Sequence, residues 1–392
     1  MKGRTTVLVG TTKGAFLLDG NPDRSAWDLR GPFCHGWPIN HVIADRSGRN
    51  LWAAGGSDWH GAGVWRSQDA GASWELRKLS NGELDRWLEN DPAAALQFGL
   101  APSPPAAFTG EMTSIWSLCA TEGLLYAGAK PAALLQSADG GESWSRVDAL
   151  TDHPSRPAWE PGGAGLVLHT IVARPDDPRK LWVGISAAGV FATEDGGATW
   201  ERRNRRSNAD SAGHAPHPGH SHDEAQEVGH CVHNMVRAPS AVSGAGDLLY
   251  QQNHHGVFRS LDGGRSWQEI GEGLPSTFGF PIAVHPHDPQ TIWTLPLNGD
   301  SIGRYPPDAS ASVWKSGDGG ATWQGHAEGL PVKNCFFTVL RQAMATDAEE
   351  AAGVYFGTNS GSVFASIDGG VSWREIARHL PTILSVETAS AS

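Results

Sequence analysis

The sequence has few of the features that would place it in a membrane or in an oxidising compartment. It contains only 4 cysteines, which are scattered over 392 residues and do not have the spacing of a disulfide framework. No segment approaches the roughly 18 consecutive apolar residues of a membrane-spanning helix. The N-terminal run MKGRTTVLVGTTKGAFLL lacks the apolar core and cleavage site of a signal peptide. These absences predict a cytoplasmic protein without a membrane partner.

Positive charge is also scarce. The chain has 30 lysine and arginine residues against 42 aspartate and glutamate residues, which gives a formal net charge of −12 at pH 7. Such an excess of negative charge repels a phosphate backbone, so the composition argues against a nucleic-acid partner. The short basic run ERRNRRS at residues 201–207 is interpreted as a solvated loop.

Glycine and tryptophan, in contrast, are abundant, with 49 and 17 residues. They recur together in six copies of an eight-residue pattern, S/T-x-D-x-G-x-S/T-W, which begin at residues 67, 137, 193, 260, 316 and 366. The copies follow one another at intervals of about 50 to 70 residues over most of the chain. This regularity identifies an internal repeat.

Each copy has the composition of a tight turn between two strands. In the copy TEDGGATW, the carboxylate of Asp195 can accept hydrogen bonds from nearby backbone N–H groups. Gly197 can adopt a positive φ without steric cost, and the ring of Trp200 can cover the turn. Six acidic turns could be metal sites or structural turns, and their regular recurrence favours structural turns.

Four short apolar runs accompany each turn, as in a blade of a β-propeller. The first runs of the six repeats contain or begin at His41, Ile115, His169, His233, Pro281 and Phe336. The N-terminal segments TVLVG, GAFLL and AWDL supply three strands of another blade, and the C-terminal segment LPTILSVET supplies its first strand. We therefore predict an all-β, seven-bladed β-propeller, a single domain over residues 1–392 that is closed by pairing of the terminal strands. This closure removes two exposed sheet edges.

With these six turns and the four-strand repeat, the whole chain resembles the Asp-box, or BNR-repeat, β-propeller family. That family includes sialidases, xyloglucan-cleaving enzymes and a photosystem II assembly factor, and its boxes are structural. The resemblance implies a sialidase-like, glycosyl hydrolase-like propeller, but the fold does not fix the activity.

Sialidase activity itself is not expected. The sialidases of this family use an arginine triad and a tyrosine nucleophile, and their N-terminal F/Y-R-I-P motif is absent here. Three of the 4 tyrosines lie inside second-strand runs, and Tyr305 lies in a proline-rich hairpin. Arginine does not recur at the starts of strands.

The topology of a four-stranded meander brings two sets of loops to one face, called here the upper face. These are the loops between strands two and three, and the loops from strand four to the next blade. Three long insertions are predicted on this face, at about residues 77–113, 147–167 and 203–231. Long loops in a compact domain are commonly functional, so this face is the predicted location of the site.

Histidines give the most specific functional signal on the upper face. His41, His169 and His233 align at the starts of innermost strands, so we expect them to line the mouth of the central channel and to bind Zn²⁺, Cu²⁺ or Fe²⁺. His254 on a neighbouring hairpin and Glu111, a potential general base, are the candidate catalytic residues. The alternative is that these histidines fill the channel as hydrogen-bonded core residues.

The cysteines near this face receive a structural interpretation. Cys34, Cys231 and Cys335 are expected to be buried small residues rather than thiolate ligands.

The favoured hypothesis is a metal-assisted hydrolase or lyase that acts on a small-molecule or glycan ligand at the upper face. Two alternatives stay open: a glycoside hydrolase that uses a pair of carboxylates, and a non-enzymatic binding or assembly propeller.

Overall fold

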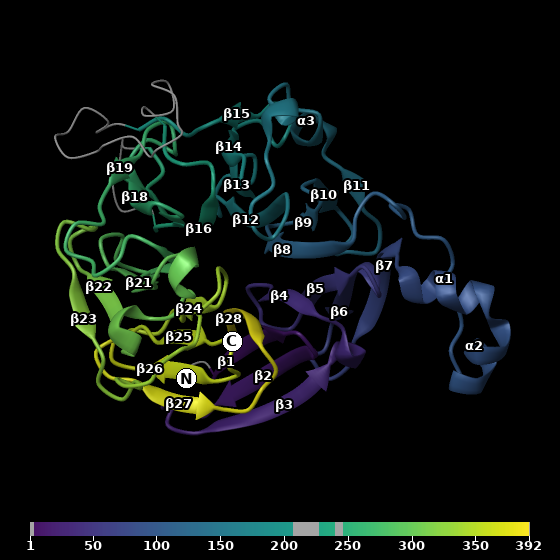
Figure 1. The fold of residues 1–392 in the computed structure, drawn as a ribbon, viewed down its shortest axis with the longest axis horizontal. Coiled ribbons are helices and arrows are strands. Elements are labelled where there is room, and N and C mark those ends of the chain that lie inside the picture. The colour runs from purple at the N-terminus through teal and green to yellow at the C-terminus, as the bar shows by residue number, and fades with distance from the viewer. Residues whose placement is uncertain (1–3, 207–226, 240–245, 392) are drawn as a thin grey trace.

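A computed structural model describes residues 4–206, 227–239 and 246–391. Seven four-stranded antiparallel sheets are arranged in a ring around a central channel (Figure 1). The predicted all-β, seven-bladed propeller is therefore confirmed.

The strands of each blade follow one another in the chain from the channel outward, except in the first blade, whose innermost strand is C-terminal. The first four blades consist of β28 (Ile383–Ala391), β1 (Arg4–Thr11), β2 (Gly14–Gly20) and β3 (Trp27–Phe33); β4 (Ile39–Ala44), β5 (Leu51–Ser57), β6 (Gly61–Ser67) and β7 (Glu75–Asn81); β8 (Ser114–Ala120), β9 (Leu125–Lys130), β10 (Leu134–Ser137) and β11 (Ser145–Arg146); and β12 (Val167–Ala173), β13 (Leu181–Ser186), β14 (Gly189–Thr193) and β15 (Glu201–Arg202). The last three blades consist of β16 (Val232–Arg237), β17 (Leu249–Asn253), β18 (Gly256–Ser260) and β19 (Gln268–Glu269); β20 (Gly279–Val284), β21 (Ile292–Pro296), β22 (Val313–Ser316) and β23 (Gln324–His326); and β24 (Met344–Thr346), β25 (Val354–Gly357), β26 (Val363–Ser366) and β27 (Arg374–Ala377).

The two ends of the chain close the ring, as predicted. β28 pairs antiparallel with β1 in a register that runs from Arg4 opposite Ala391 to Thr11 opposite Ile383. The N- and C-terminal strands thereby share one blade, and the labelled termini lie close together in Figure 1.

The first strand of the seventh blade differs from the prediction. We expected it at the apolar run that begins at Phe336, but the strand is β24, which begins at Met344. The backbone N–H of Thr338 instead donates to the side chain of Asn359 (2.7 Å), and the carbonyl of Thr338 accepts from the N–H of Asn359 (2.9 Å). Phe337 is buried in the core without joining a sheet, so the apolar run marks burial rather than strand pairing.

Short helices lie in two of the predicted insertions. The first insertion contains α1 (Glu83–Asn90) and α2 (Pro92–Phe98), which extend outward from the ring, and the second contains α3 (Asp148–Thr151) (Figure 1). Residues 207–226 of the third insertion lie outside the described residues. Within the described ranges, none of the helices is long and apolar enough to cross a membrane.

The six repeated turns share one hydrogen-bond pattern. In the third box, Thr193 donates to one carboxylate oxygen of Asp195 (2.7 Å) and accepts from the N–H of Gly197 (2.9 Å). The N–H and hydroxyl of Thr199 donate to the two oxygens of Asp195 (2.9 and 2.6 Å). Gly197 has a φ of 93°, which favours glycine. Both oxygens of the aspartate are engaged inside the turn, as a structural role requires.

Replacing the first residue of a box should therefore destabilise the fold. Ser260 is buried, donates to Asp262 (2.8 Å) and accepts from the N–H of Gly264 (2.7 Å). Ser260→Ala leaves that N–H unpaired and should lower the free energy of unfolding by about 1–3 kcal/mol in denaturant titration. The control is Ser301→Ala, because Ser301 is exposed and its hydroxyl has no hydrogen bond within the described residues. Equal stability of the two variants would contradict the structural role of the box.

Candidate functional site

Three potential metal ligands come together at the start of the fifth blade. One ligand atom from each of Cys231, His233 and His254 lies within 4.8 Å of the other two. Cys231 and His233 are two residues apart in an extended segment, so their side chains lie on the same side of the backbone. His254 lies in the β17–β18 hairpin, and its backbone N–H donates to the carbonyl of Cys231 (3.0 Å). We call these three residues the Cys–His cluster.

A hydrogen bond fixes the tautomer of His233. Its Nδ1 lies 2.5 Å from the backbone carbonyl of Gly279, in β20 of the next blade. A carbonyl can only accept, so Nδ1 carries the proton and Nε2 is the nitrogen with the lone pair. That Nε2 lies 3.7 Å from the Sγ of Cys231, so the lone pair is directed into the cluster. This is the arrangement that orients a histidine ligand in metal sites.

Aromatic rings enclose His233. Its ring centroid lies 4.5 Å from that of Phe280, 5.3 Å from that of Phe278 and 5.4 Å from that of His254. Burial, and then the positive charge of Arg341, hold the pKa of His233 well below its usual value. The imidazole is therefore neutral near pH 7, as a metal ligand must be. Cys231 and His254 are half-buried, which leaves the cluster open to a ligand.

His169 lies on the neighbouring blade but outside this cluster. Its Nδ1 lies 2.9 Å from the hydroxyl of Thr170, and that hydroxyl donates to Asn234 (3.2 Å). Thr170 must therefore accept from Nδ1, which leaves Nε2 unprotonated. This Nε2 is buried and has no hydrogen-bond partner among the described residues. Burial and the charge of Arg341 lower the pKa of His169 to about 3, so it is a neutral acceptor.

His41 has both ring nitrogens occupied by the protein. Its Nδ1 accepts from the backbone N–H of Leu118 (2.9 Å), so Nε2 carries the proton and donates to Glu387 (3.2 Å). Of the three predicted metal ligands, the described part of the chain thus brings only His233 into a cluster of metal-binding groups.

A β-bulge explains why His41 differs. In three blades the pairing between the first two strands skips one residue, and the skipped residues are Trp116, His169 and His233. In the second blade the skipped residue is Asn40. His41 lies one position further along, and a shift of one residue turns a side chain to the other face. The structure therefore does not place His41 at the position equivalent to the other two histidines.

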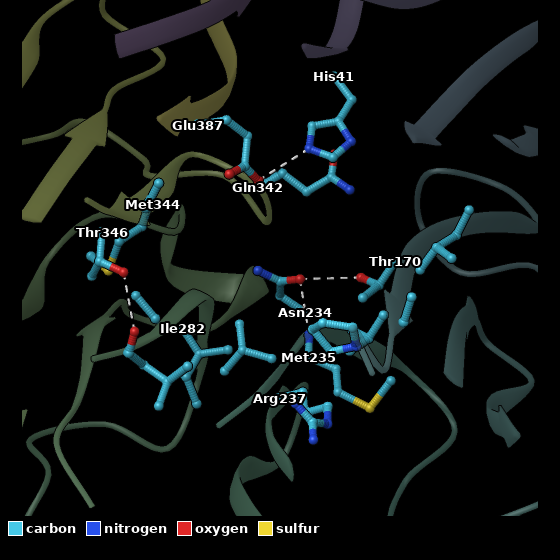
Figure 2. Close-up of a pocket in the computed structure, with 18 residues that line it drawn as sticks. His41, Thr170, Asn234, Met235, Arg237, Ile282, Gln342, Met344, Thr346 and Glu387 are labelled. Carbon is cyan, nitrogen blue, oxygen red and sulfur yellow. Dashed lines mark hydrogen bonds and ion pairs between the residues drawn. The ribbon is translucent and has the colours of Figure 1, made fainter. Parts of the chain in front are cut away.

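His41 instead lines a cavity further along the channel. The cavity has a volume of about 330 Å³, and His41, Thr170, Asn234 and Glu387 point into it from the innermost strands β4, β12, β16 and β28 (Figure 2). None of the residues of the Cys–His cluster lines this cavity. We call it the lower cavity.

The two predicted catalytic residues have different surroundings. Glu111 is half-exposed and forms an ion pair with Arg146 of β11 (3.2 Å), the outermost strand of its blade. It is not part of the Cys–His cluster. His254 belongs to the cluster, where its position is that of a metal ligand. The sequence analysis expected Cys231 to be a buried small residue, but it is only half-buried and lies within the cluster, and its spacing from His233 on an extended segment was a usable signal.

The comparisons with known proteins establish the fold and nothing finer. No family model and no curated protein matches the chain. Among solved structures, the GH74 xyloglucanase from Xanthomonas campestris is 16% identical with a TM-score of 0.59, and the match covers 100% of this chain and 53% of the xyloglucanase. A putative 6-phosphogluconolactonase from Bacteroides uniformis is 10% identical with a TM-score of 0.56, with 99% and 100% covered. Apo AztD from Citrobacter koseri is 10% identical with a TM-score of 0.53, with 100% and 99% covered.

The chain thus spans about half the length of the xyloglucanase that it matches. All three structures are similar in fold at low identity, and the Asp-box resemblance continues to rest on the repeated turns and the propeller.

Proposed function

We propose that the Cys–His cluster is a transition-metal centre and that the protein is a metal-dependent hydrolase or lyase acting on a small molecule. The observation that carries this proposal is the approach of three ligand atoms, from Cys231, His233 and His254, to within 4.8 Å of one another. They come from two segments of one blade, and the orienting carbonyl of Gly279 comes from the next blade. A site assembled in this way needs the folded propeller.

The donor set narrows the choice of metal. One thiolate and two imidazoles suit Zn²⁺, and they also suit copper, because both metals bind sulfur and nitrogen donors. Three protein ligands with one position left open are typical of catalytic rather than structural zinc sites. When bound, such a metal supplies Lewis-acid catalysis.

The surroundings of the cluster support a reactive rather than a purely structural role. Phe278 and Phe280 pack against the buried His233, while Cys231 and His254 are half-buried and give the cluster its accessible side. A low-dielectric wall beside an accessible position strengthens electrostatic interactions with a bound substrate.

The glycoside hydrolase alternative has less support from side-chain positions. Glu111 is paired with Arg146 (3.2 Å), and Asp300 is paired with Arg304 (2.5 Å). Each carboxylate is thus held by a cation within hydrogen-bonding distance. The non-enzymatic alternative is favoured by one observation, the lower cavity, which could hold a small ligand without any chemistry.

Metal analysis of protein purified without an affinity tag tests the proposal. We expect about one equivalent of zinc or copper per chain. After removal by a chelator, Co²⁺ should restore the site and give a thiolate-to-metal charge-transfer band, because Cys231 is a ligand. Cys231→Ser should lose this band. The matched control, Cys119→Ser, should keep it, since Cys119 lies in β8 and outside the cluster.

Protein that binds no metal under these conditions would exclude the metal centre. A Cys231→Ser variant with an unchanged Co²⁺ spectrum would exclude Cys231 as a ligand. The first result would leave a binding propeller as the better interpretation, and the second would require a metal site formed without Cys231.

A further inference from the structure

Arg341 brings a positive charge to the Cys–His cluster. Its guanidinium lies over the ring of Phe280, 5.1 Å from the centroid, and the same ring lies 4.5 Å from that of His233. The charge of Arg341 lowers the pKa of His233 and the pKa of His169, and the guanidinium also interacts electrostatically with Cys231. Arg341 and His233 therefore contact the same ring, that of Phe280, which places the guanidinium beside the cluster.

This guanidinium forms no ion pair within the described residues, although Asp300, which is itself paired with Arg304, acts on its pKa from a greater distance. No carboxylate in those ranges lies within 4.0 Å of Arg341, and its buried Nε has no hydrogen-bond partner there. Two other arginines whose guanidinium groups are buried are paired with carboxylates. Arg203 pairs with Glu194 (3.0 Å), and Arg237 pairs with Asp247 (2.7 Å).

Arg341 is half-buried, and burial lowers the pKa of its guanidinium because the charge is solvated less well there than in water. The structural contribution of this residue comes from its backbone, since its carbonyl accepts a hydrogen bond from the side chain of Asn234 (2.8 Å). No ion pair among the described residues uses the charge of the guanidinium. An anionic ligand would compensate it, and a planar guanidinium is suited to bidentate contacts with carboxylate or phosphate oxygens.

We propose that Arg341 binds an anionic group of the substrate, a carboxylate or a phosphate, next to the metal position of the Cys–His cluster. This inference deepens the proposed function and rests on it for the reacting centre. Arg341 anchors the anion, and the reacting part of the molecule extends toward the open position beside Cys231 and His254. The substrate class is therefore a small carboxylate- or phosphate-bearing molecule.

Arg304 provides a matched control. Its guanidinium lies over the same ring of Phe280, 5.7 Å from the centroid, but it is 45% exposed and paired with Asp300. Arg304 has the same stacking partner and a counter-ion of its own. A comparison of the two arginines separates charge compensation from stacking.

The experiment is calorimetric titration with inorganic phosphate and, separately, with acetate, on metal-free and Zn²⁺-loaded full-length protein. We expect Arg341→Gln to weaken binding of the preferred anion by at least about tenfold, the effect of losing a hydrogen bond to a charged group. Arg341→Lys should keep the positive charge but lose the bidentate contacts of the planar guanidinium, so we expect an intermediate loss of anion affinity. Arg304→Gln should bind within about twofold of the unsubstituted protein.

The outcomes separate the two proposals. If neither anion binds, or if Arg341→Gln binds both anions as tightly as the unsubstituted protein, the anion site is wrong, whatever the metal content. If the protein contains no metal but binds an anion in an Arg341-dependent manner, the metal function fails and the anion site stands. If Arg341→Gln does not fold, the Arg341→Lys variant decides. If this variant binds phosphate and acetate as tightly as the unsubstituted protein does, recognition by the planar guanidinium group is contradicted.

Discussion

Deletion of residues 383–392 is expected to make the protein aggregate. These residues include all of β28, the innermost strand of the first blade. Ile383, Ser385 and Val386 are fully buried, so the deletion removes part of the core as well as a strand. It also leaves β1 with an unpaired edge over Arg4–Thr11, a template for pairing with another chain.

Solubility, gel filtration and circular dichroism after expression measure this effect. The expected result is an almost complete loss of soluble protein. A synthetic peptide with the sequence of β28, added during refolding, should restore part of the soluble fraction by pairing with β1. The control is removal of Ser392 alone, because that residue lies beyond β28. A deletion variant that stays in solution, elutes as the intact chain does and unfolds at the same temperature would show that closure by β28 is dispensable.

The repeated turns explain why most of the fold could be predicted from the sequence. Each box combines an aspartate, a glycine that needs positive φ and a neighbouring hydroxyl, and the structure uses these groups in the same way in every copy. Such a turn depends on eight consecutive residues, so its signal is local and visible in the sequence. The number of turns and the strands left at the two ends then determined seven blades.

Prediction failed where an apolar run had no such local signal. The run that begins at Phe336 has the hydrophobicity of a strand, but its backbone is satisfied by contacts such as that between Thr338 and Asn359. Hydrophobicity reports burial, and burial is compatible with an irregular segment. Only the partner of each N–H group, which the sequence does not reveal, separates the two cases.

The candidate site was predictable only in part for a related reason. Aligning the innermost strands by their apolar runs placed His41 with His169 and His233, because a β-bulge of one residue leaves no clear mark in the sequence. Gly279 and Arg341 reach the cluster from other blades. Their positions depend on how the blades pack against one another, which no local pattern encodes.

Separate substitution of the three histidines should distinguish the two possible ligand sets. His233→Ala should lower the affinity for Zn²⁺ by more than about 100-fold, because loss of a residue that merely orients a ligand already costs 10–100-fold. His169→Ala should change the affinity by less than about threefold, since His169 is outside the cluster. The same holds for His41→Ala, because both nitrogens of His41 are engaged by Leu118 and Glu387.

Competition with a chromophoric chelator measures these affinities, and the unfolding midpoint of each variant shows whether it is folded. All three histidines are buried, so each alanine creates a similar cavity and the variants act as controls for one another. An equal loss of affinity in all three would restore a converging set of His41, His169 and His233 at the channel mouth. An unchanged affinity in His233→Ala would remove the Cys–His cluster as the metal centre. A selective loss in His233→Ala assigns the ligand to the one histidine whose tautomer the carbonyl of Gly279 has already fixed for metal binding.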